Sequence, residues 1–148
     1  MNEIMIREAE IEDAKSIQQI NLSALGYKFD IESTTSQLIS VLNSRSGKIF
    51  VAVVESDVVG YIHANDYICT YASSVKDIIG LAVLSEYQKL GIGRKLLEKL
   101  EEWAKADGSD GVRLVSGIDR QDSHEFYLRC GYESRKDQKN FLKLFNEL

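Results

Sequence analysis

A chain of 148 residues with 44% apolar content is long enough to form one hydrophobic core without help from a metal or a disulfide. The formal charge of −5 and the pI near 5.1 argue against a dedicated nucleic-acid binder, which would carry a basic surplus. No apolar stretch approaches the ~20 residues needed to span a bilayer, and Cys69 and Cys130 lack metal-ligand spacing. We therefore expect one cytoplasmic domain over residues 1–148, with no metal, nucleic-acid or membrane partner.

The first half of the chain alternates between strand-like and helix-like hydrophobic patterns. The predicted elements are a strand over Met5–Glu8, helices over Ile11–Leu25 and Ser33–Ser44, and strands over Ile49–Val54 and Val58–Asp66. Gly26 and Tyr27 end the first helix, and Ser56 and Asp57 form the turn that joins the last two strands into a hairpin. Residues 66–76 are then expected to form a loop or the end of a strand.

The second half begins with an apolar strand over Ile78–Val83, which is followed by a glycine-bearing turn and a long amphipathic helix. Small and apolar residues form one stripe of that helix: Gly93, Leu96, Leu97, Leu100, Trp103 and Ala104. Gly108 is the expected left-handed end of the helix. The predicted order closes with a strand over Val112–Val115, a short helix containing Phe126 and Tyr127, and strands near Tyr132–Lys136 and Phe141–Leu144.

The turn from Gln88 to Gly93 is the most informative segment, because it joins an apolar strand to the start of a helix. Its two glycines let the backbone approach a ligand, and unpaired N–H groups at a helix N-terminus attract anions. We therefore predict a ligand that contains phosphate. A P-loop is disfavoured because Arg94 and Lys95 stand where Lys and then Ser or Thr would follow Gly93, and a dinucleotide fingerprint would need a third glycine at Leu96.

At these residues the chain resembles the GNAT superfamily of acetyl-CoA-dependent N-acetyltransferases. The family signature is Gln or Arg, two residues, Gly, one residue, and Gly or Ala, and it is filled by Gln88, Gly91 and Gly93. A second family element, a short helix with Phe-Tyr that ends in Gly and an aromatic residue, is similar to Ser123–Tyr132. The resemblance covers essentially the whole chain. It implies an α/β (α+β) fold with a mixed, mostly antiparallel sheet of six to seven strands, splayed at its centre, and with helices on both faces.

The resemblance also implies that acetyl-CoA is the co-substrate and lies in the split of the sheet, with no metal. Its pantetheine arm would pair like an extra strand with the backbone of Leu81, Ala82 and Val83. Gly80, beside this segment, marks a local bulge or a close approach of the thioester. The cofactor-binding residues implied for the signature turn are Gln88, Lys89, Leu90, Gly91, Ile92, Gly93 and Arg94.

The implied reaction is the transfer of an acetyl group to a primary amine by direct attack in a ternary complex. An ammonium with a reference pKa of ~10.4 must first lose its proton, which costs about 4 to 5 kcal/mol at pH 7. Several family members have a glutamate early on the central strand, and alignment through the glycine turn places Asp77 at that position, so the resemblance makes Asp77 the first candidate for the base. Regular alternation would place it on the same face as Ile79 and Leu81. Asp77 is explained equally well as the end of a loop before a buried strand. His63 is the second candidate, because imidazole titrates near neutrality.

The second family element suggests an acid and further cofactor contacts. Tyr127 fills the place of the tyrosine that reprotonates or holds the leaving thiolate in relatives, although aromatic packing explains it too. Many relatives carry an asparagine three residues before a small residue, where this chain has Arg120 and Ser123. Both are implied cofactor contacts, whereas an exposed arginine paired with a neighbouring aspartate is the alternative for Arg120. His124 resembles a histidine of one subgroup and is as well explained by structure as by catalysis.

The acceptor is the part that the resemblance leaves open. In relatives its wall is formed by the first two helices and the loop between them, here around Leu25 to Ile31, together with the loop that corresponds to Tyr67 to Lys76. In these loops Tyr27, Phe29, Tyr67 and Tyr71 form an aromatic pocket or ordinary packing. The acceptor amine can belong to a small molecule or to a protein or peptide. Whether the chain forms a homodimer is a separate open point. The alternative function is a non-catalytic acetyl-CoA-binding sensor or regulatory module, which needs the glycine turn but neither an acid nor a base.

Overall fold

A computed structural model describes residues 3–117 and 119–146 of the chain. They divide after Leu114 into two compact units. Within the described residues, the larger unit contains a β-sheet and three α-helices, and the smaller unit contains one short α-helix, α4 (Gln121–Arg129). No helix in the described ranges has both the length and the apolar character needed to cross a bilayer.

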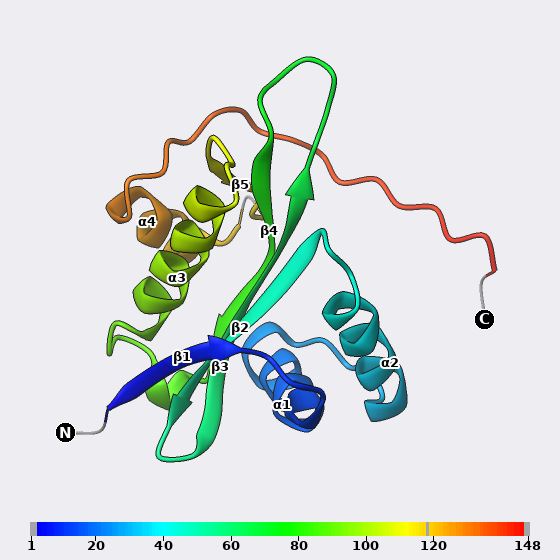
Figure 1. The fold of residues 1–148 in the computed structure, drawn as a ribbon, viewed down its shortest axis with the longest axis vertical. Helices are drawn as coiled ribbons and strands as arrows, with labels where there is room; N and C mark the ends of the chain where they lie inside the picture. The colour runs from blue at the N-terminus through cyan, green and yellow to red at the C-terminus, as the bar shows by residue number, and fades with distance from the viewer. Residues whose placement is uncertain (1–2, 118, 147–148) are drawn as a thin grey trace. The chain divides into compact units, whose positions relative to one another are not determined.

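Five strands of the larger unit form one sheet in chain order (Figure 1). The strands are β1 (Ile4–Glu8), β2 (Gly47–Val54), β3 (Asp57–Tyr67), β4 (Val75–Val83) and β5 (Val112–Leu114). The first four pair antiparallel, and β5 pairs parallel to β4. The β2–β3 hairpin turns at Glu55 and Ser56, one residue earlier than predicted, and their φ angles of 50° and 76° match the right-handed twist of the flanking strands.

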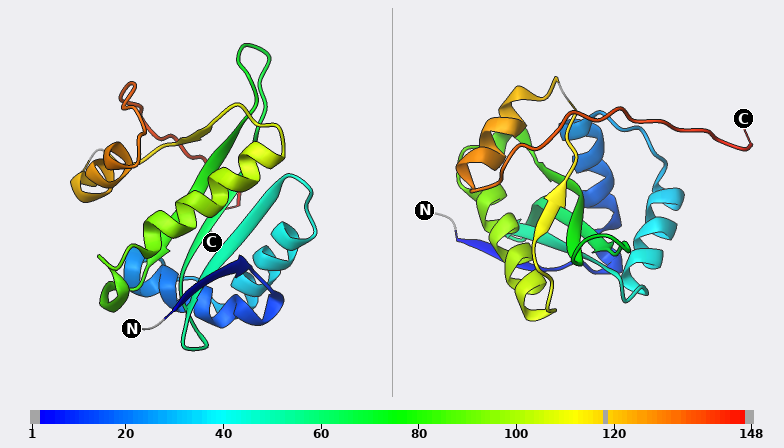
Figure 2. Two further views of the ribbon diagram at one scale, coloured as in Figure 1. Left: turned by 60° about the vertical axis from the view of Figure 1, so that its left-hand side comes forward. Right: turned by 90° about the horizontal axis from the view of Figure 1, so that it is seen from above.

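Helices cover both faces of this sheet, as Figures 1 and 2 show. Helices α1 (Ala14–Leu25) and α2 (Ile31–Leu42) lie on one face, called the α1 face below, and α3 (Ile92–Ala106) lies on the other, the α3 face. The core of the α1 face includes Ile17, Ile20, Leu38, Ile49, Val51, Val53, Tyr61 and Ala82. On the α3 face, the ring of Trp103 packs edge-on against Phe50 at a centroid distance of 6.3 Å. The predicted apolar stripe is confirmed, because Leu96, Leu97 and Leu100 are fully buried.

The helix ends largely follow the sequence signals. Gly26, with a φ of 75°, ends α1, and Gly108, with a φ of 78°, follows the end of α3, as predicted. Helix α2 begins two residues before the predicted start, because Asp30 caps it. The Asp30 carboxylate accepts the Ser33 N–H at 2.6 Å and thereby satisfies a donor that has no partner inside the helix.

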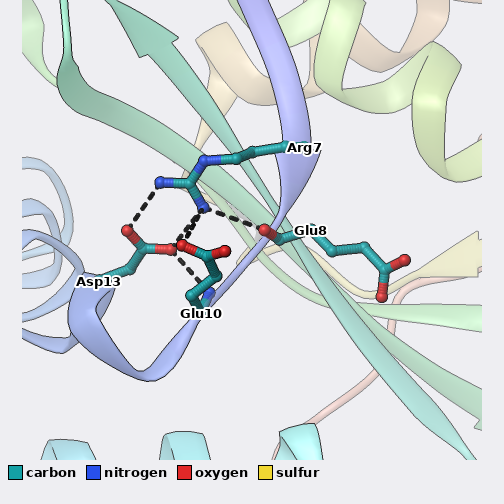
Figure 3. Close-up of polar contacts among 4 residues, drawn as sticks. All are labelled: Arg7, Glu8, Glu10 and Asp13. Atoms are coloured by element: carbon teal, nitrogen blue, oxygen red, sulfur yellow. Dashed lines mark hydrogen bonds and ion pairs between the residues drawn. The ribbon is translucent and has the colours of Figure 1, made fainter.

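An ion pair fixes the junction between β1 and α1 (Figure 3). The two terminal nitrogens of the Arg7 guanidinium donate to the two carboxylate oxygens of Asp13 at 2.8 and 3.0 Å. The same carboxylate accepts the Glu10 N–H at 2.7 Å. Burial raises the pKa of Asp13, but the hydrogen bonds from Arg7 and Glu10 outweigh burial and leave that pKa below its usual value. The predicted helix begins with a 3₁₀ turn, Ile11–Asp13, and continues as α1.

Strand β4 contains a bulge at Ile79. In the pairing with β3, Gly80 lies opposite His63 and Ile78 lies opposite Ala64, so Ile79 has no partner residue on β3. The bulge predicted beside Gly80 is thus confirmed. Because successive strand residues point to opposite faces, one extra residue reverses the faces of all the residues that follow it.

The two ends of β4 accordingly contribute to opposite faces. Ala82 belongs to the core of the α1 face, whereas Lys76, six residues earlier, points to the α3 face. The Lys76 ammonium lies 4.1 Å from the ring centroid of Trp103 and donates to the carboxylates of Asp66 and Asp107. Lys76 is only 1% exposed, so its buried charge depends on these partners.

The far edge of β4 is open over its second half. Strand β5 pairs with β4 only at 76–78, and it ends at Leu114, one residue earlier than predicted. In the described part of the chain, residues 79–83 therefore have a neighbouring strand on the β3 side alone. This open edge agrees with the predicted splay of the sheet.

The prediction of six to seven strands was wrong for the described residues, which form five. The expected closing strands at 132–136 and 141–144 belong to no helix or strand. Residues 132–136 carry one apolar side chain, Tyr132, so pairing them would bury little surface against the entropy of ordering the backbone. Phe141 and Phe145 are 86% and 88% exposed, so the apolar character of that segment is not used in a core.

Candidate functional site

The open edge of β4 presents backbone groups that no strand of the described chain uses. The Leu84 N–H donates to the Val59 carbonyl on β3 at 2.9 Å. Because residues of an antiparallel pair alternate between facing the partner and facing away, Leu81 and Val83 direct their N–H and C=O groups to the open edge. Gln88 agrees with this assignment, since its side-chain amide donates to the Val83 carbonyl at 3.0 Å. The edge is thus suited to pairing with an extended polar ligand.

The glycine turn follows directly from this edge. A 3₁₀ turn, Ser85–Tyr87, leads from β4 to Gln88, and Lys89 and Gly91 then have positive φ angles of 65° and 83°. Alternation between left-handed and right-handed residues curls successive N–H groups toward one side, which forms a concave site for anions. Lys89 adopts a conformation that is unfavourable for a side chain, so this turn holds local strain.

The first turn of α3 leaves backbone donors without intrahelical acceptors. Gly91 is the residue before the helix, and no side chain caps it. The first bond of the helical ladder runs from the Lys95 N–H to the Gly91 carbonyl at 3.1 Å, so the N–H groups of Ile92 and Gly93 precede the ladder. The exposed side chains of Lys89, Arg94 and Lys95 add positive charge to that of the helix dipole. The turn therefore combines several donors with cations at one position.

Asp77 is tied to the strand next to it. Its carboxylate accepts from the Arg113 guanidinium at 2.9 Å, and Arg113 lies over the ring of Tyr67, 4.3 Å from its centroid. Burial raises the pKa of Asp77, while the charge and hydrogen bond of Arg113 act in the opposite direction and only partly compensate. Sequence reasoning missed Arg113, whose only signal is a charged residue between two apolar residues of a short strand.

The bulge corrects the predicted face of Asp77. Asp77 lies opposite Asn65 on β3, and Leu81 lies opposite Ile62. Since Asn65 and Ile62 are an odd number of residues apart on a strand that is regular there, Asp77 and Leu81 point to opposite faces. The prediction that alternation puts them on one face was wrong, because Ile79 is inserted between them. Asp77 instead shares the α1 face with Asn65.

His63 also points to the α1 face, two residues from Asn65. Its Nε2 and the Asn65 amide oxygen are 3.2 Å apart. Burial lowers the pKa of His63, and the hydrogen bond to Asn65 offsets this only in part. Nearer the start of the strand, the Tyr61 hydroxyl donates to the Asn21 amide oxygen of α1 at 2.5 Å. Sequence reasoning missed Asn65 and Asn21, since single asparagines carry no motif.

The predicted acceptor aromatics fall into two groups. Tyr27 and Phe29 line a surface hollow of about 320 Å³ beside α1, together with Gln18, Leu22, Lys28 and Asp30. Burial, with a smaller effect from the nearby Tyr27, raises the pKa of Tyr61 to about 12. Tyr67 and Tyr71 do not line this hollow, and a hydrogen bond between them raises the pKa of Tyr71. Tyr71 is 82% exposed.

The remaining predicted site residues belong to the smaller unit. Arg120 precedes α4, and Ser123 lies in the first turn of that helix. His124 Nε2 donates to the Gly117 carbonyl at 2.8 Å, which closes the loop before the helix. The ring of Tyr127 makes an edge contact with Tyr132, at a centroid distance of 5.7 Å. Burial raises the pKa of Tyr127 to about 12, so its phenol keeps its proton at neutral pH.

Comparison with known proteins identifies relatives over most of the chain. The model of the acetyltransferase (GNAT) family matches residues 14–132. Aminoalkylphosphonate N-acetyltransferase of Salmonella typhimurium is 29% identical over 129 residues, which cover 86% of this chain and 84% of that protein. Aminoglycoside N(6')-acetyltransferase type 1 of Stenotrophomonas maltophilia is 27% identical over 133 residues, covering 86% of this chain and 85% of the relative.

Solved structures share the fold. An aminoglycoside N-acetyltransferase in complex with CoA superimposes with a TM-score of 0.86 at 15% identity, over 97% of this chain and 96% of that one. A transcriptional regulator from Bacillus halodurans also has a TM-score of 0.86, at 19% identity, over 95% and 100% of the two chains. At these identities the likeness concerns the fold alone. It confirms the predicted α/β class, with a mostly antiparallel sheet and helices on both faces.

Proposed function

The chain belongs to the acetyltransferase (GNAT) family and is an N-acetyltransferase, and from this premise we propose that it transfers an acetyl group from acetyl-CoA to a primary amine by direct attack in a ternary complex. The observation that carries the proposal is that an open strand edge, a left-handed turn and an uncapped helix start follow one another directly along the chain. These features offer backbone donors and acceptors in a row, as an extended ligand with a diphosphate at one end requires.

Acetyl-CoA fits the residues present. Leu81 and Val83 would pair with the amide groups of the pantetheine arm, and Ala82 keeps the strand in register between them. The diphosphate would take N–H groups of the turn, with Arg94 as a charge partner, while Gln88 holds the turn to the end of β4. When bound, acetyl-CoA supplies the acyl thioester. The chain supplies orientation, the removal of a proton from the amine, and a proton for the departing thiolate.

Tyr127 is the proposed acid. A phenol is protonated at neutral pH and can donate its hydrogen to a thiolate. Burial raises the pKa of Tyr127 to about 12, which keeps the phenol protonated but makes it a weaker acid, so its role includes a hydrogen bond to the sulfur. Arg120 and Ser123, at the start of the same short helix, are the proposed cofactor contacts of the smaller unit. These assignments follow the family resemblance of the Phe-Tyr helix. Asp77 and His63 are the two proposed candidates for the base.

We propose that the acceptor is an amine on a small molecule or on a protein or peptide. The small-molecule class is favoured by the two curated relatives, whose names give an aminoalkylphosphonate and an aminoglycoside as acceptors. The hollow beside α1 supports an acceptor of modest size, because Tyr27 and Phe29 offer aromatic surface and Asp30 lies among its lining residues.

The test is thiol release from acetyl-CoA, measured against a library of primary amines that includes aminoalkylphosphonates, aminoglycosides and short peptides. We expect release that depends on at least one amine, and mass spectrometry should find that amine heavier by one acetyl group. Isothermal titration with acetyl-CoA and CoA runs in parallel. Tight binding of acetyl-CoA without transfer to any amine would favour the alternative, a non-catalytic acetyl-CoA-binding module.

A further inference from the structure

A row of polar side chains lies on the α1 face where β4 departs from β5. Tyr61, His63 and Asn65 occupy alternate positions of β3 and so share this face. The bulge brings Asp77 to the same face, opposite Asn65, and Arg113 reaches it from β5. All five belong to the larger unit, whose core positions them.

This row lies next to the position expected for the thioester. If the diphosphate is held at the turn and the pantetheine arm pairs with Val83 and Leu81, the arm runs toward Gly80 and advances about 3.3 Å per residue. His63 lies directly opposite Gly80 on the neighbouring strand. Gly80 has no side chain, and the Tyr61 phenol fills the space that a Cβ would take there, so His63 and Tyr61 both border this stretch of β4. A Cβ there would come within 3.2 Å of the Tyr61 hydroxyl.

His63 has one ring nitrogen committed and one available. The Asn65 amide oxygen can only accept a hydrogen bond, so the contact at 3.2 Å requires the proton on His63 Nε2. The lone pair of the neutral ring is then on Nδ1, and within the described residues no group hydrogen-bonds to that atom. The Asn65 amide oxygen lies in the space that a side chain at position 47 would need, so Gly47 leaves room for it.

Asp77 is engaged differently. Its carboxylate already accepts a hydrogen bond from Arg113 at 2.9 Å. If Asp77 took the proton of the amine, the Arg113 guanidinium, whose side chain is 26% exposed, would lose the negative charge that balances it. Asp77 therefore serves as the counter-ion of Arg113, and the imidazole is the better proton acceptor in the row.

We propose that His63 is the general base of the transfer reaction and that Asn65 is the positioning residue that fixes its tautomer. This assignment rests on the proposed function, since it takes the reacting amine to lie beside Gly80. In the step itself, Nδ1 accepts one proton from the substrate ammonium and gives an imidazolium and a neutral amine. The amine nitrogen forms a bond to the thioester carbonyl carbon, the C–S bond breaks, and the thiolate takes a proton from Tyr127 or from solvent. The acylated nitrogen loses its second surplus proton to the Tyr127 phenolate or to water, which leaves the neutral amide and restores the phenol. The imidazolium then releases its proton to water.

The environment of His63 suits this cycle. Burial lowers its pKa, so the imidazole is neutral at pH 7 and gives up an acquired proton readily. The ionisable groups that face it are Tyr61 and Tyr67 on β3, Asp77 on β4 and Arg113 on β5. The last two form a pair with no net charge. The rate should therefore fall at acidic pH, with a midpoint below the ordinary imidazole value of about 6.5.

The experiment is the pH profile of kcat/KM for thiol release, with the best amine of the library, for the wild-type chain and three variants. His63→Gln should lower kcat/KM by about 10²-fold or more and abolish the acid limb, with the Kd for acetyl-CoA unchanged. Asn65→Asp should move the midpoint of the acid limb to higher pH, because a carboxylate beside Nε2 stabilises the imidazolium. His124→Gln is the matched control and should keep the acid limb in place, since the chain has only these two histidines.

The outcomes separate this inference from the proposed function. If the wild-type chain is active and His63→Gln retains its rate and its acid limb, the assignment of His63 is overturned while the acetyltransferase function stands. If the acid limb of Asn65→Asp does not move, the proposed role of Asn65 is overturned. The same variant still tests the assignment if His63→Gln does not fold. If the folded wild-type chain binds acetyl-CoA but acetylates no amine, the proposed function fails, and the assignment of a base fails with it.

Discussion

Gly91 offers the sharpest test of the anion-binding turn. Its φ of 83° lies in the left-handed region, and a Cβ added there would meet no atom within 4 Å. The replacement Gly91→Ala therefore introduces conformational strain without a clash, and we expect it to cost about 1 to 2 kcal/mol. The chain can relieve this strain by rotating the turn, which would misdirect its N–H groups. If half to all of that energy is lost from ligand binding, the Kd for acetyl-CoA rises about 2- to 30-fold.

Gly108 provides a matched control at the other end of the same helix. Its φ is 78°, and a Cβ there would likewise meet nothing within 4 Å. Gly108→Ala should lower the free energy of unfolding by the same ~1 to 2 kcal/mol, measured by urea denaturation, yet leave the Kd for acetyl-CoA unchanged in isothermal titration. Equal Kd values for Gly91→Ala and Gly108→Ala, at equal loss of stability, would refute the assignment of the turn to the diphosphate.

Three further predictions concern an acid, a turn contact and an ion pair. Tyr127→Phe should lower kcat about 10²-fold in the thiol-release assay and leave the Kd for acetyl-CoA within about twofold, because it removes only a transferable proton; an unchanged kcat would exclude Tyr127 as the acid. Gln88→Ala removes the bond to the Val83 carbonyl and should raise the KM for acetyl-CoA about fivefold, whereas Gln88→Glu, which cannot donate there when ionised, should do no better. Asp13→Asn breaks the paired bonds from Arg7 and should reduce the free energy of unfolding by about 2 kcal/mol at pH 7. Since the pKa of Asp13 is lower in the folded chain than in the unfolded chain, its contribution is present above the unfolded pKa and is lost as pH falls through the folded pKa. The variant should therefore match the wild type in acid unfolding, and a constant difference at every pH would contradict the role of the ion pair.

Local signals in the sequence were enough for the features that depend on neighbouring residues. The stripe of α3 repeats every three to four residues, and Gly26 and Gly108 each end a helix by a left-handed residue, so one segment contains the whole signal. The glycine turn from Gln88 to Gly93 was predictable for the same reason, because one short segment contains its whole signal. The closing strands were not predictable in this way, because a strand needs a pairing partner that the segment itself does not specify.

Lys76 shows what pattern reasoning could not reach. As a lysine before an apolar strand it resembles an exposed loop residue, but it is buried between Asp66 and Asp107 and lies against Trp103. Asp66 belongs to β3, whereas Trp103 and Asp107 belong to α3 and its end, so only the tertiary structure brings them together around Lys76. Despite burial, which acts to lower it, the hydrogen bonds and charges of the two aspartates raise the pKa of Lys76.

The bulge at Ile79 explains why Asp77 lies on the same face of the sheet as His63 and Asn65. With regular alternation, Asp77 would point to the same face as Leu81 and away from His63 and Asn65, and the polar row could not form. The inserted residue brings Asp77 to the α1 face, while Ala82 is still packed under α1. It lies one residue after the last pair between β4 and β5, so the edge opens where the polar row begins. One extra residue therefore places the proposed base next to the proposed path of the pantetheine arm.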